Sequence, residues 1–193
     1  HGGGVYLAAS DIEVRGNRIA GNVVGREMGS GWGGGIRVYG EGSRAVLTAC
    51  LEAGVRRIVV SSSGAAYGYH RDNPEWLTET DPLRGNDDFP YSRHKRLVEE
   101  MLAEARAEHP ELEQVIFRIG TILGNTVRNQ ITALWDGPRI LKIAGSESPF
   151  VFVWVDDVVG AMVRAVSGGP AGVFNVAGDG KVTVDEIAEW FET

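Results

Sequence analysis

The chain has 193 residues, with 19 Lys and Arg against 26 Asp and Glu, and a formal net charge of −7 at pH 7. This length is enough for one domain with a sizeable core. An acidic chain lacks the basic stripe that nucleic-acid binding requires, so we expect no nucleic-acid partner. No run approaches the roughly 18 apolar residues of a membrane span, and Cys50 is the only cysteine. We therefore expect a cytoplasmic protein without membrane contact or disulfides.

The first 37 residues differ in composition from the rest. The motif Gly2-Gly-Gly-Val-Tyr-Leu7 recurs as Gly33-Gly-Gly-Ile-Arg-Val38, with short β-prone runs between them. Such runs, broken by Gly and Asn, resemble coils of a parallel β-helix. The spacing of Gly29 to Gly34 also fits Gly-x-Gly-x-x-Gly, but the residues before it do not predict a strand, and Ile36-Arg-Val-Tyr39 after it predicts a strand rather than a helix. We predict a Gly/Asn-rich β segment over residues 1–37, not native to the fold of residues 38–193.

The next region reads as a strand–helix–strand crossover. An apolar helix over residues 45–52 is followed by the β-branched strand Arg57-Ile-Val-Val-Ser61, which runs on into Ser62 and Ser63. Pro90 predicts a helix start, for which Asp87 or Asp88 could supply the cap. A second strand over residues 114–118 completes the crossover.

Tyr91 and Lys95 are four residues apart, so a helix places both side chains on one face. An ammonium beside a phenol favours the phenolate, which suits Tyr91 to give and accept a proton. A serine at the end of the preceding strand could orient the reacting oxygen. The same pair also suits an ordinary solvated helix start, but the serines at the strand end favour the catalytic interpretation.

The remaining pattern alternates strands and helices. Residues 140–144 and 150–155 predict strands, and residues 158–166 a helix that Asp156 or Asp157 would cap. Those aspartates are not a metal pair, because adjacent side chains diverge and no His or Cys cluster accompanies them. Residues 173–176 predict a strand, and residues 184–191 a helix capped by Thr183. The fold class is therefore α/β, an incomplete Rossmann-like parallel sheet with flanking helices.

From about residue 38 onward the chain resembles the extended short-chain dehydrogenase/reductases, the NAD-dependent epimerase/dehydratase family. The resemblance rests on an ordered set of motifs: Gly42-Ser-Arg-Ala-Val-Leu47, Ala53-Gly-Val-Arg-Arg-Ile-Val-Val-Ser-Ser-Ser63, Ala66-Tyr-Gly68, Tyr91-Ser-Arg-His-Lys95, Phe117-Arg-Ile-Gly-Thr-Ile-Leu-Gly124, Phe152-Val-Trp-Val-Asp-Asp-Val158 and Gly172-Val-Phe-Asn-Val-Ala-Gly178. It implies an NAD- or NADP-dependent epimerase, dehydratase or reductase that acts on a nucleotide sugar or a similar hydroxyl or carbonyl substrate.

The resemblance also implies roles for individual residues. The catalytic group would be Ser63, Tyr91 and Lys95; the cofactor contacts Ser61, Tyr91, Lys95, Ile119 and Gly120; the substrate contacts Ser62, Thr121 and Asn129; and no residue would bind a metal. In relatives the helix that carries this tyrosine commonly forms a dimer contact, so a homodimer is a further expectation.

Two expectations remain open. Such enzymes begin with a strand and a glycine turn that hold the dinucleotide pyrophosphate, and we expect this chain to bind the dinucleotide weakly without that turn. The alternative to an enzyme is a non-catalytic Rossmann-like remnant or binding module that lacks the dinucleotide phosphate loop. Phosphate contacts could come from Arg118, Arg128, Arg139 or Lys142, although each is more simply a surface charge.

Overall fold

The computed structural model describes residues 41–129, 131–134, 140, 142 and 149–191. Within them, a parallel sheet holds β1 (Arg57–Ser63), β2 (Glu113–Ile119) and β5 (Gly172–Val176) in the order β1-β2-β5. The predicted α/β class with a Rossmann-like parallel sheet is confirmed. The predicted segment 1–37 and most of the predicted strand 140–144 lie outside the described residues.

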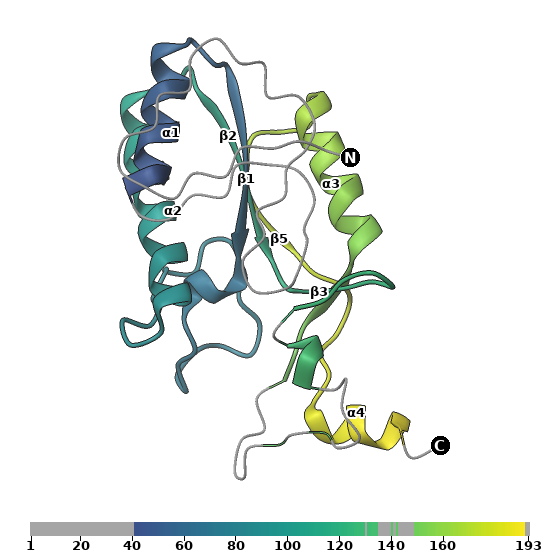
Figure 1. The fold of residues 1–193 in the computed structure, drawn as a ribbon. Coiled ribbons are helices and arrows are strands. Elements are labelled where there is room, and N and C mark those ends of the chain that lie inside the picture. The colour runs from purple at the N-terminus through teal and green to yellow at the C-terminus, as the bar shows by residue number, and fades with distance from the viewer. Residues whose placement is uncertain (1–40, 130, 135–139, 141, 143–148, 192–193) are drawn as a thin grey trace.

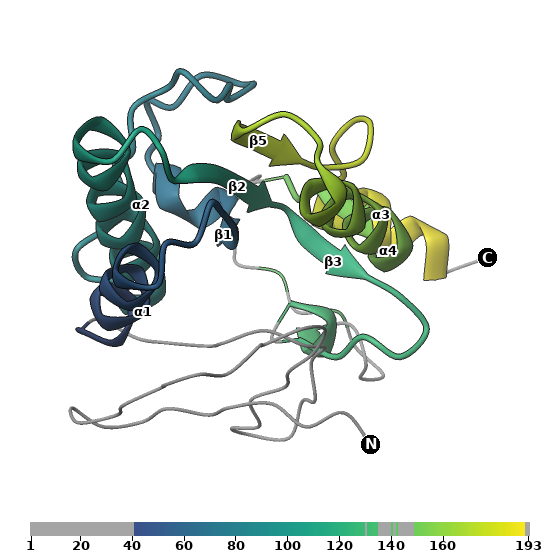
Figure 2. The same cartoon turned by 90° about the horizontal axis from the view of Figure 1, so that it is seen from above.

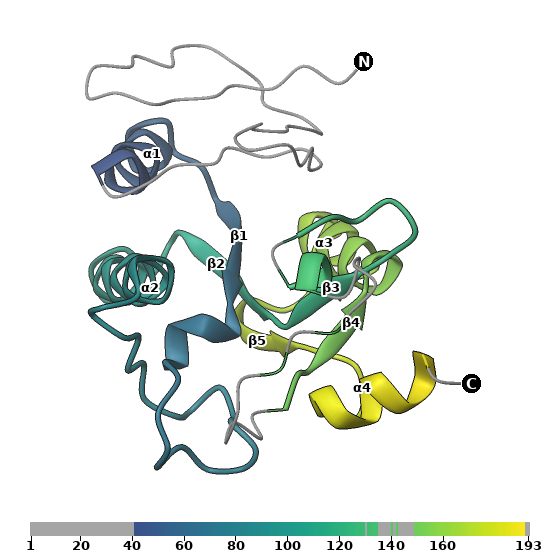
Figure 3. The same ribbon diagram turned by 60° about the horizontal axis from the view of Figure 1, so that its bottom comes forward.

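Helices cover both faces of this sheet (Figures 1 and 2). α1 (Glu41–Glu52) and α2 (Pro90–Glu108) lie side by side on one face, and α3 (Val155–Ser167) lies on the other. A second parallel pair joins β3 (Thr121–Leu123) to β4 (Phe152–Trp154). The short α4 (Val184–Phe191) lies away from α1 and α2, as Figure 3 shows.

β2 is the centre of the core, and its residues are buried from Gln114 to Ile119. Alternate side chains of a strand point to opposite faces. Accordingly Val115, Phe117 and Ile119 share a cluster with residues of α3, whereas Ile116 packs with Leu102 of α2. A strand buried on both faces explains the continuous apolar run that predicted it.

The carboxyl ends of the three strands meet at one edge of the sheet. Ser63 of β1 is in register with Ile119 of β2, and Ile119 with Val176 of β5. Immediately after Ser63 the chain turns into the 3₁₀-helix η1 (Gly64–Tyr67), against which α2 packs. This edge therefore collects the residues that the sequence singles out.

Two expected helix caps are wrong. The N-cap of α2 is Phe89, with no side-chain cap hydrogen bond, and Asp87 instead forms an ion pair with Arg96 at 2.7 Å. The N-cap of α3 is Trp154, so Asp156 and Asp157 lie inside its first turn. They still lie at the positive end of the α3 helix dipole, which favours acidic residues there.

Thr183 and Glu186 form a capping box at the start of α4. The Glu186 N–H donates to Thr183 Oγ1 at 3.2 Å, and Glu186 Oε2 accepts from the Thr183 N–H at 2.7 Å. The Thr183 hydroxyl also donates to Glu186 Oε2, at 2.8 Å. The pKa of Glu186 is lowered first by the bond from the Thr183 N–H and second by the bond from the Thr183 hydroxyl. The expected cap at Thr183 is confirmed, and Glu186 is a second member of the cap that the sequence did not predict.

The capping box predicts a pH dependence confined to α4. Because the folded-state pKa of Glu186 lies below its unfolded value, the box stabilises α4 at neutral pH and weakens as the pH falls below the ordinary range of a glutamate and through that lowered pKa. The protection factors of the α4 amides, which are exchange rates corrected for the pH dependence of intrinsic exchange, should fall on acidification in the wild type. Glu186→Gln should abolish most of this pH dependence, whereas Glu189→Gln, on the same helix, should preserve it; equal behaviour of the two variants would contradict the box.

Candidate functional site

Lys95 and Tyr91 lie together at the carboxyl edge of the sheet, on the first two turns of α2. The Lys95 ammonium donates to the Ser61 carbonyl at 2.8 Å, which anchors α2 to the end of β1. The same nitrogen lies 5.7 Å from the centroid of the Tyr91 ring, within range of a cation–π contact. Tyr91 is 44% exposed, so a ligand can reach it.

Ser63 and Ser92 fix the turn that faces this helix. Ser63 is the N-cap of η1, and its hydroxyl accepts from the Ala65 N–H at 3.2 Å. Ser92, next to Tyr91, is completely buried. Its hydroxyl donates to the Ala65 carbonyl at 2.6 Å and accepts from the Asn86 N–H at 3.0 Å. One serine thus ties the start of α2 to the turn that follows Ser63.

A buried ion pair lies behind the site. The Arg118 guanidinium binds Glu99 Oε2 at 2.8 Å, and their side chains are 6% and 2% exposed. The Ser62 hydroxyl donates to the other carboxylate oxygen of Glu99. Since Glu99 follows Lys95 by one helical turn, it faces the same strand. The expectation that Arg118 is a surface charge is wrong, because Arg118 is buried in the core and forms an ion pair with Glu99.

Arg118 extends this network to Tyr67. Its Nη1 donates to the Tyr67 hydroxyl at 2.8 Å and to the Glu79 carbonyl at 3.1 Å. The guanidinium also lies 4.7 Å from the centroid of the Tyr67 ring. The Tyr67 oxygen lies 2.7 Å from Asn175 Oδ1 on β5. Three strands and α2 are therefore joined by polar groups at this edge.

The remaining predicted contacts lie at and beyond the end of β2. Ile119 is buried, and the Gly120 and Thr121 N–H groups donate to Val176 O and Val151 O at 3.0 and 2.9 Å. Their amides are thus already used within the protein. The Asn129 side chain accepts from two backbone N–H groups of the loop leading into η2 (Thr132–Leu134) and donates to the Ile122 carbonyl, so it organises that loop.

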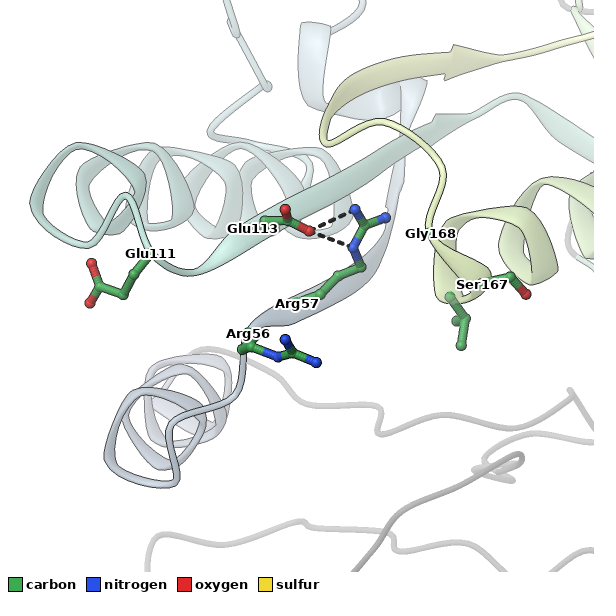
Figure 4. A pocket seen from close by; sticks show the side chains of 7 residues that line it. Arg56, Arg57, Glu111, Glu113, Ser167 and Gly168 are labelled. Carbon is green, nitrogen blue, oxygen red and sulfur yellow. Dashed lines mark hydrogen bonds and ion pairs between the residues drawn. The ribbon is translucent and has the colours of Figure 1, made fainter.

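A pocket of about 420 Å³ lies where β1 and β2 begin (Figure 4), at the opposite end of these strands from Ser63 and Ile119. It is bordered by the first residues of β1 and β2 and the last turn of α3. Arg57 there forms an ion pair with Glu113 at 2.6 Å and donates to the carbonyls of Ala165 and Gly169. Cations that bind the last carbonyls of a helix stabilise its C-terminus. Arg57 therefore stabilises the C-terminal end of α3.

The described part of the chain holds neither a candidate metal cluster nor a helix that could span a membrane. Among those residues, no group of three or more His, Cys, Asp or Glu side chains is placed to hold a metal ion. None of the helices described is both long and apolar enough to cross a membrane.

Sequence reasoning missed Ser92 and Glu99. A signal for Glu99 exists, because an acidic residue one turn after Lys95 shares the face that α2 turns to the sheet. The matching signal for Arg118 is its place inside an apolar strand, where a charge needs a partner. Ser92 carried no signal, since a serine in a first helical turn is usually exposed.

The family model described as "NAD dependent epimerase/dehydratase family" matches residues 35–177. Among curated proteins, an uncharacterized protein of Mycobacterium tuberculosis is 26% identical over 140 residues, which cover 72% of this chain and 37% of that protein. An uncharacterized protein of Sinorhizobium fredii is 27% identical, with 64% of this chain and 31% of that protein covered.

Solved structures with the same fold include nucleotide-sugar enzymes. The UDP-glucose 4-epimerase of Thermus thermophilus in complex with NAD is 28% identical with a TM-score of 0.63, covering 77% of this chain and 51% of that one. The dTDP-glucose 4,6-dehydratase of Streptomyces venezuelae with NAD bound is 26% identical with a TM-score of 0.63, covering 78% and 47%.

The chain thus spans about half the length of these structures and about a third of the curated relatives. The matched stretch of the family model holds β1, α2, β2 and β5, together with Tyr91 and Lys95. On this match over most of its length, the chain belongs to the NAD-dependent epimerase/dehydratase family.

Proposed function

We propose that this protein is an NAD(P)-dependent epimerase, dehydratase or reductase, acting on a hydroxyl or carbonyl group of a nucleotide sugar or a similar substrate. One observation carries the proposal: Lys95 is anchored to Ser61 at 2.8 Å while its ammonium lies 5.7 Å from the Tyr91 ring. The pair lies at the carboxyl ends of parallel strands, where open α/β sheets bind ligands. Family membership supports the choice of cofactor.

Tyr91 is the proposed general acid and base. Its phenolic oxygen takes the proton of a substrate hydroxyl when that carbinol carbon is oxidised, and it returns the proton when the carbonyl is reduced. The Lys95 ammonium, 5.7 Å from the centroid of the Tyr91 ring, is proposed to hold the cofactor ribose beside this oxygen. The Ser63 hydroxyl, at the end of β1, is proposed to hold the reacting oxygen. Bound NAD(P) supplies the hydride chemistry that no side chain can perform.

The described residues fit the nicotinamide-ribose end of a dinucleotide. An ammonium and a phenol held close together at a partly exposed position are suitable partners for vicinal ribose hydroxyls. The chain after β2 makes a close approach at Gly120, where an added Cβ would lie 2.9 Å from Val151 O. Because the Gly120 N–H is used within the sheet, any contact of Ile119 or Gly120 with the cofactor would involve carbonyl oxygens or side-chain surface.

A turnover and binding experiment tests the function. The 193-residue chain is incubated with UDP-glucose or dTDP-glucose at about millimolar NAD or NADP, and the sugar protons are followed by NMR. We expect a change at the sugar that requires the dinucleotide, together with calorimetric dissociation constants well above the micromolar range. A dinucleotide that binds while every sugar stays unchanged would favour the binding module over the enzyme. Failure to bind any dinucleotide would contradict the enzyme and favour the non-catalytic remnant.

A further inference from the structure

Two exposed aromatic rings, Tyr69 and Phe89, form a row with the ring of Tyr91, the proposed acid and base. The ring centroids of Tyr69 and Phe89 are 5.9 Å apart, and those of Phe89 and Tyr91 are 6.1 Å apart. Tyr69 is 67% exposed, Phe89 42% and Tyr91 44%. Neither Tyr69 nor Phe89 has a part in the proposed proton transfer. Contiguous exposed apolar surface of this kind commonly marks a place where a ligand or partner binds.

Hydrogen bonds of Asn86 hold the backbone that carries Tyr69 and Phe89. The Tyr69 N–H donates to Asn86 Oδ1 at 2.7 Å, and the Phe89 N–H donates to the Asn86 carbonyl at 3.2 Å. The Asn86 N–H in turn donates to the buried hydroxyl of Ser92 at 3.0 Å. One asparagine therefore positions both rings relative to α2 and to Tyr91. Gly68, before Tyr69, has φ +79° and no space for a Cβ, which would meet the Arg84 carbonyl at 2.3 Å.

We propose that Tyr69 and Phe89, together with the Tyr91 ring, form a stacking surface for the pyranose ring of the sugar substrate. This inference rests on the proposed function, because Tyr91 marks where the reacting carbon lies. A ring that reaches the Tyr91 oxygen while touching Phe89 and Tyr69 is the reacting sugar itself or the part directly attached to it.

The geometry of the row favours a sugar over a flat base. Neighbouring rings are tilted by 43° and 41°, so no single plane runs along the three faces. A nucleobase could stack on only one of them. A pyranose chair instead directs C–H groups in several directions, and these weakly positive groups are attracted to the negative faces of aromatic rings. The row therefore suits a puckered aliphatic ring with polar edges.

Binding measurements with two probes test the proposal. UDP-glucose and UDP are titrated by calorimetry into the wild type and into Tyr69→Ala, Phe89→Ala, Phe89→Leu and Tyr69→Phe. We expect each alanine variant to bind UDP-glucose roughly three- to tenfold more weakly, the range expected for a lost aromatic contact, while UDP binding stays constant. Tyr69→Phe keeps the ring and should keep the affinity within about twofold, whereas Phe89→Leu keeps volume without a ring and should behave like alanine.

Trp76→Ala provides the matched control. Trp76 is 56% exposed in the same long connection, but it contacts Lys181 rather than the row. Its loss should leave both probes unaffected, and thermal unfolding confirms that every variant compared is folded. Saturation-transfer NMR adds a direct readout, since the sugar protons should lose signal in the alanine variants while the uracil protons keep theirs.

Other outcomes of these measurements would contradict the stacking surface. Unchanged UDP-glucose affinity in both alanine variants would overturn the stacking surface while leaving the proposed function intact. Equal weakening of UDP would show that the rings bind the nucleotide instead, and a shift from dimer to monomer would show that they form a subunit contact. A wild type that binds neither UDP-glucose nor any dinucleotide would overturn the proposed function and this inference with it.

Discussion

Tyr91→Phe should lower the turnover number by about 10²- to 10⁴-fold, the usual contribution of a general acid–base group. The substitution removes one oxygen and keeps the ring, which is 44% exposed at the mouth of the site. Substrate binding should therefore change far less than turnover, so the loss should appear in kcat and only weakly in KM. Steady-state rates at saturating substrate and dinucleotide measure both constants.

Lysine variants separate the role of the ammonium from a general charge effect. Lys95→Met removes the cation that is bound to Ser61 and lies over the Tyr91 ring, and it should also reduce turnover strongly. Lys181→Met removes a comparable surface cation, paired with Glu75 at 2.7 Å, and should leave turnover unchanged. Full activity in Tyr91→Phe would exclude Tyr91 as the acid and base and would remove the main support for the proposed mechanism.

Local patterns were sufficient to predict most of the fold. The β-branched run that begins at Arg57 and the apolar run around Val115 became parallel neighbours, because strands of that composition are stable only when both faces are covered. Pro90 marked the first residue of α2 correctly, since its fixed φ suits the first helical turn. These signals act within a few residues, so the sequence displays them directly.

Long-range contacts explain what the sequence did not show. Asp87 was expected to cap α2 but pairs with Arg96, a choice that depends on how the loop before Pro90 returns to the helix. Arg118 appeared to be a surface charge because its partner Glu99 lies on another element, 19 residues earlier in the chain. The row formed by Tyr69 and Phe89 likewise depends on Asn86 bonding to both backbones, which no local periodicity reveals.

The buried pair of Glu99 and Arg118 should dominate the stability of the site. Glu99→Ala would leave the Arg118 guanidinium, now 6% exposed, without its carboxylate, and Arg118→Met would leave the Glu99 carboxylate, 2% exposed, without its cation. Removing one partner of a buried pair typically costs about 3–5 kcal/mol of unfolding free energy, because the remaining charge is uncompensated. Urea denaturation should show this loss in each single variant.

A double variant and a surface control complete the test. Glu99→Leu combined with Arg118→Met replaces both charges with apolar side chains of similar length, so much of the lost unfolding free energy should return. Arg84→Ala breaks a pair with Asp72 in which both side chains are more than a third exposed, and it should leave the urea midpoint almost unchanged. If Glu99→Ala costs no more than Arg84→Ala, the buried pair does not stabilise the fold.

Recovery of stability in the double variant should not bring recovery of function. Without Glu99, the Ser62 hydroxyl loses its acceptor, and without Arg118 the Tyr67 hydroxyl loses its charged donor. Ser62 directly precedes Ser63 in β1, and Tyr67 is the last residue of η1, the turn against which α2 packs. The double variant should therefore unfold at a urea concentration near that of the wild type and still turn over substrate more slowly. Those two results together would show that the Glu99–Arg118 pair maintains the geometry of the site in addition to stabilising the fold.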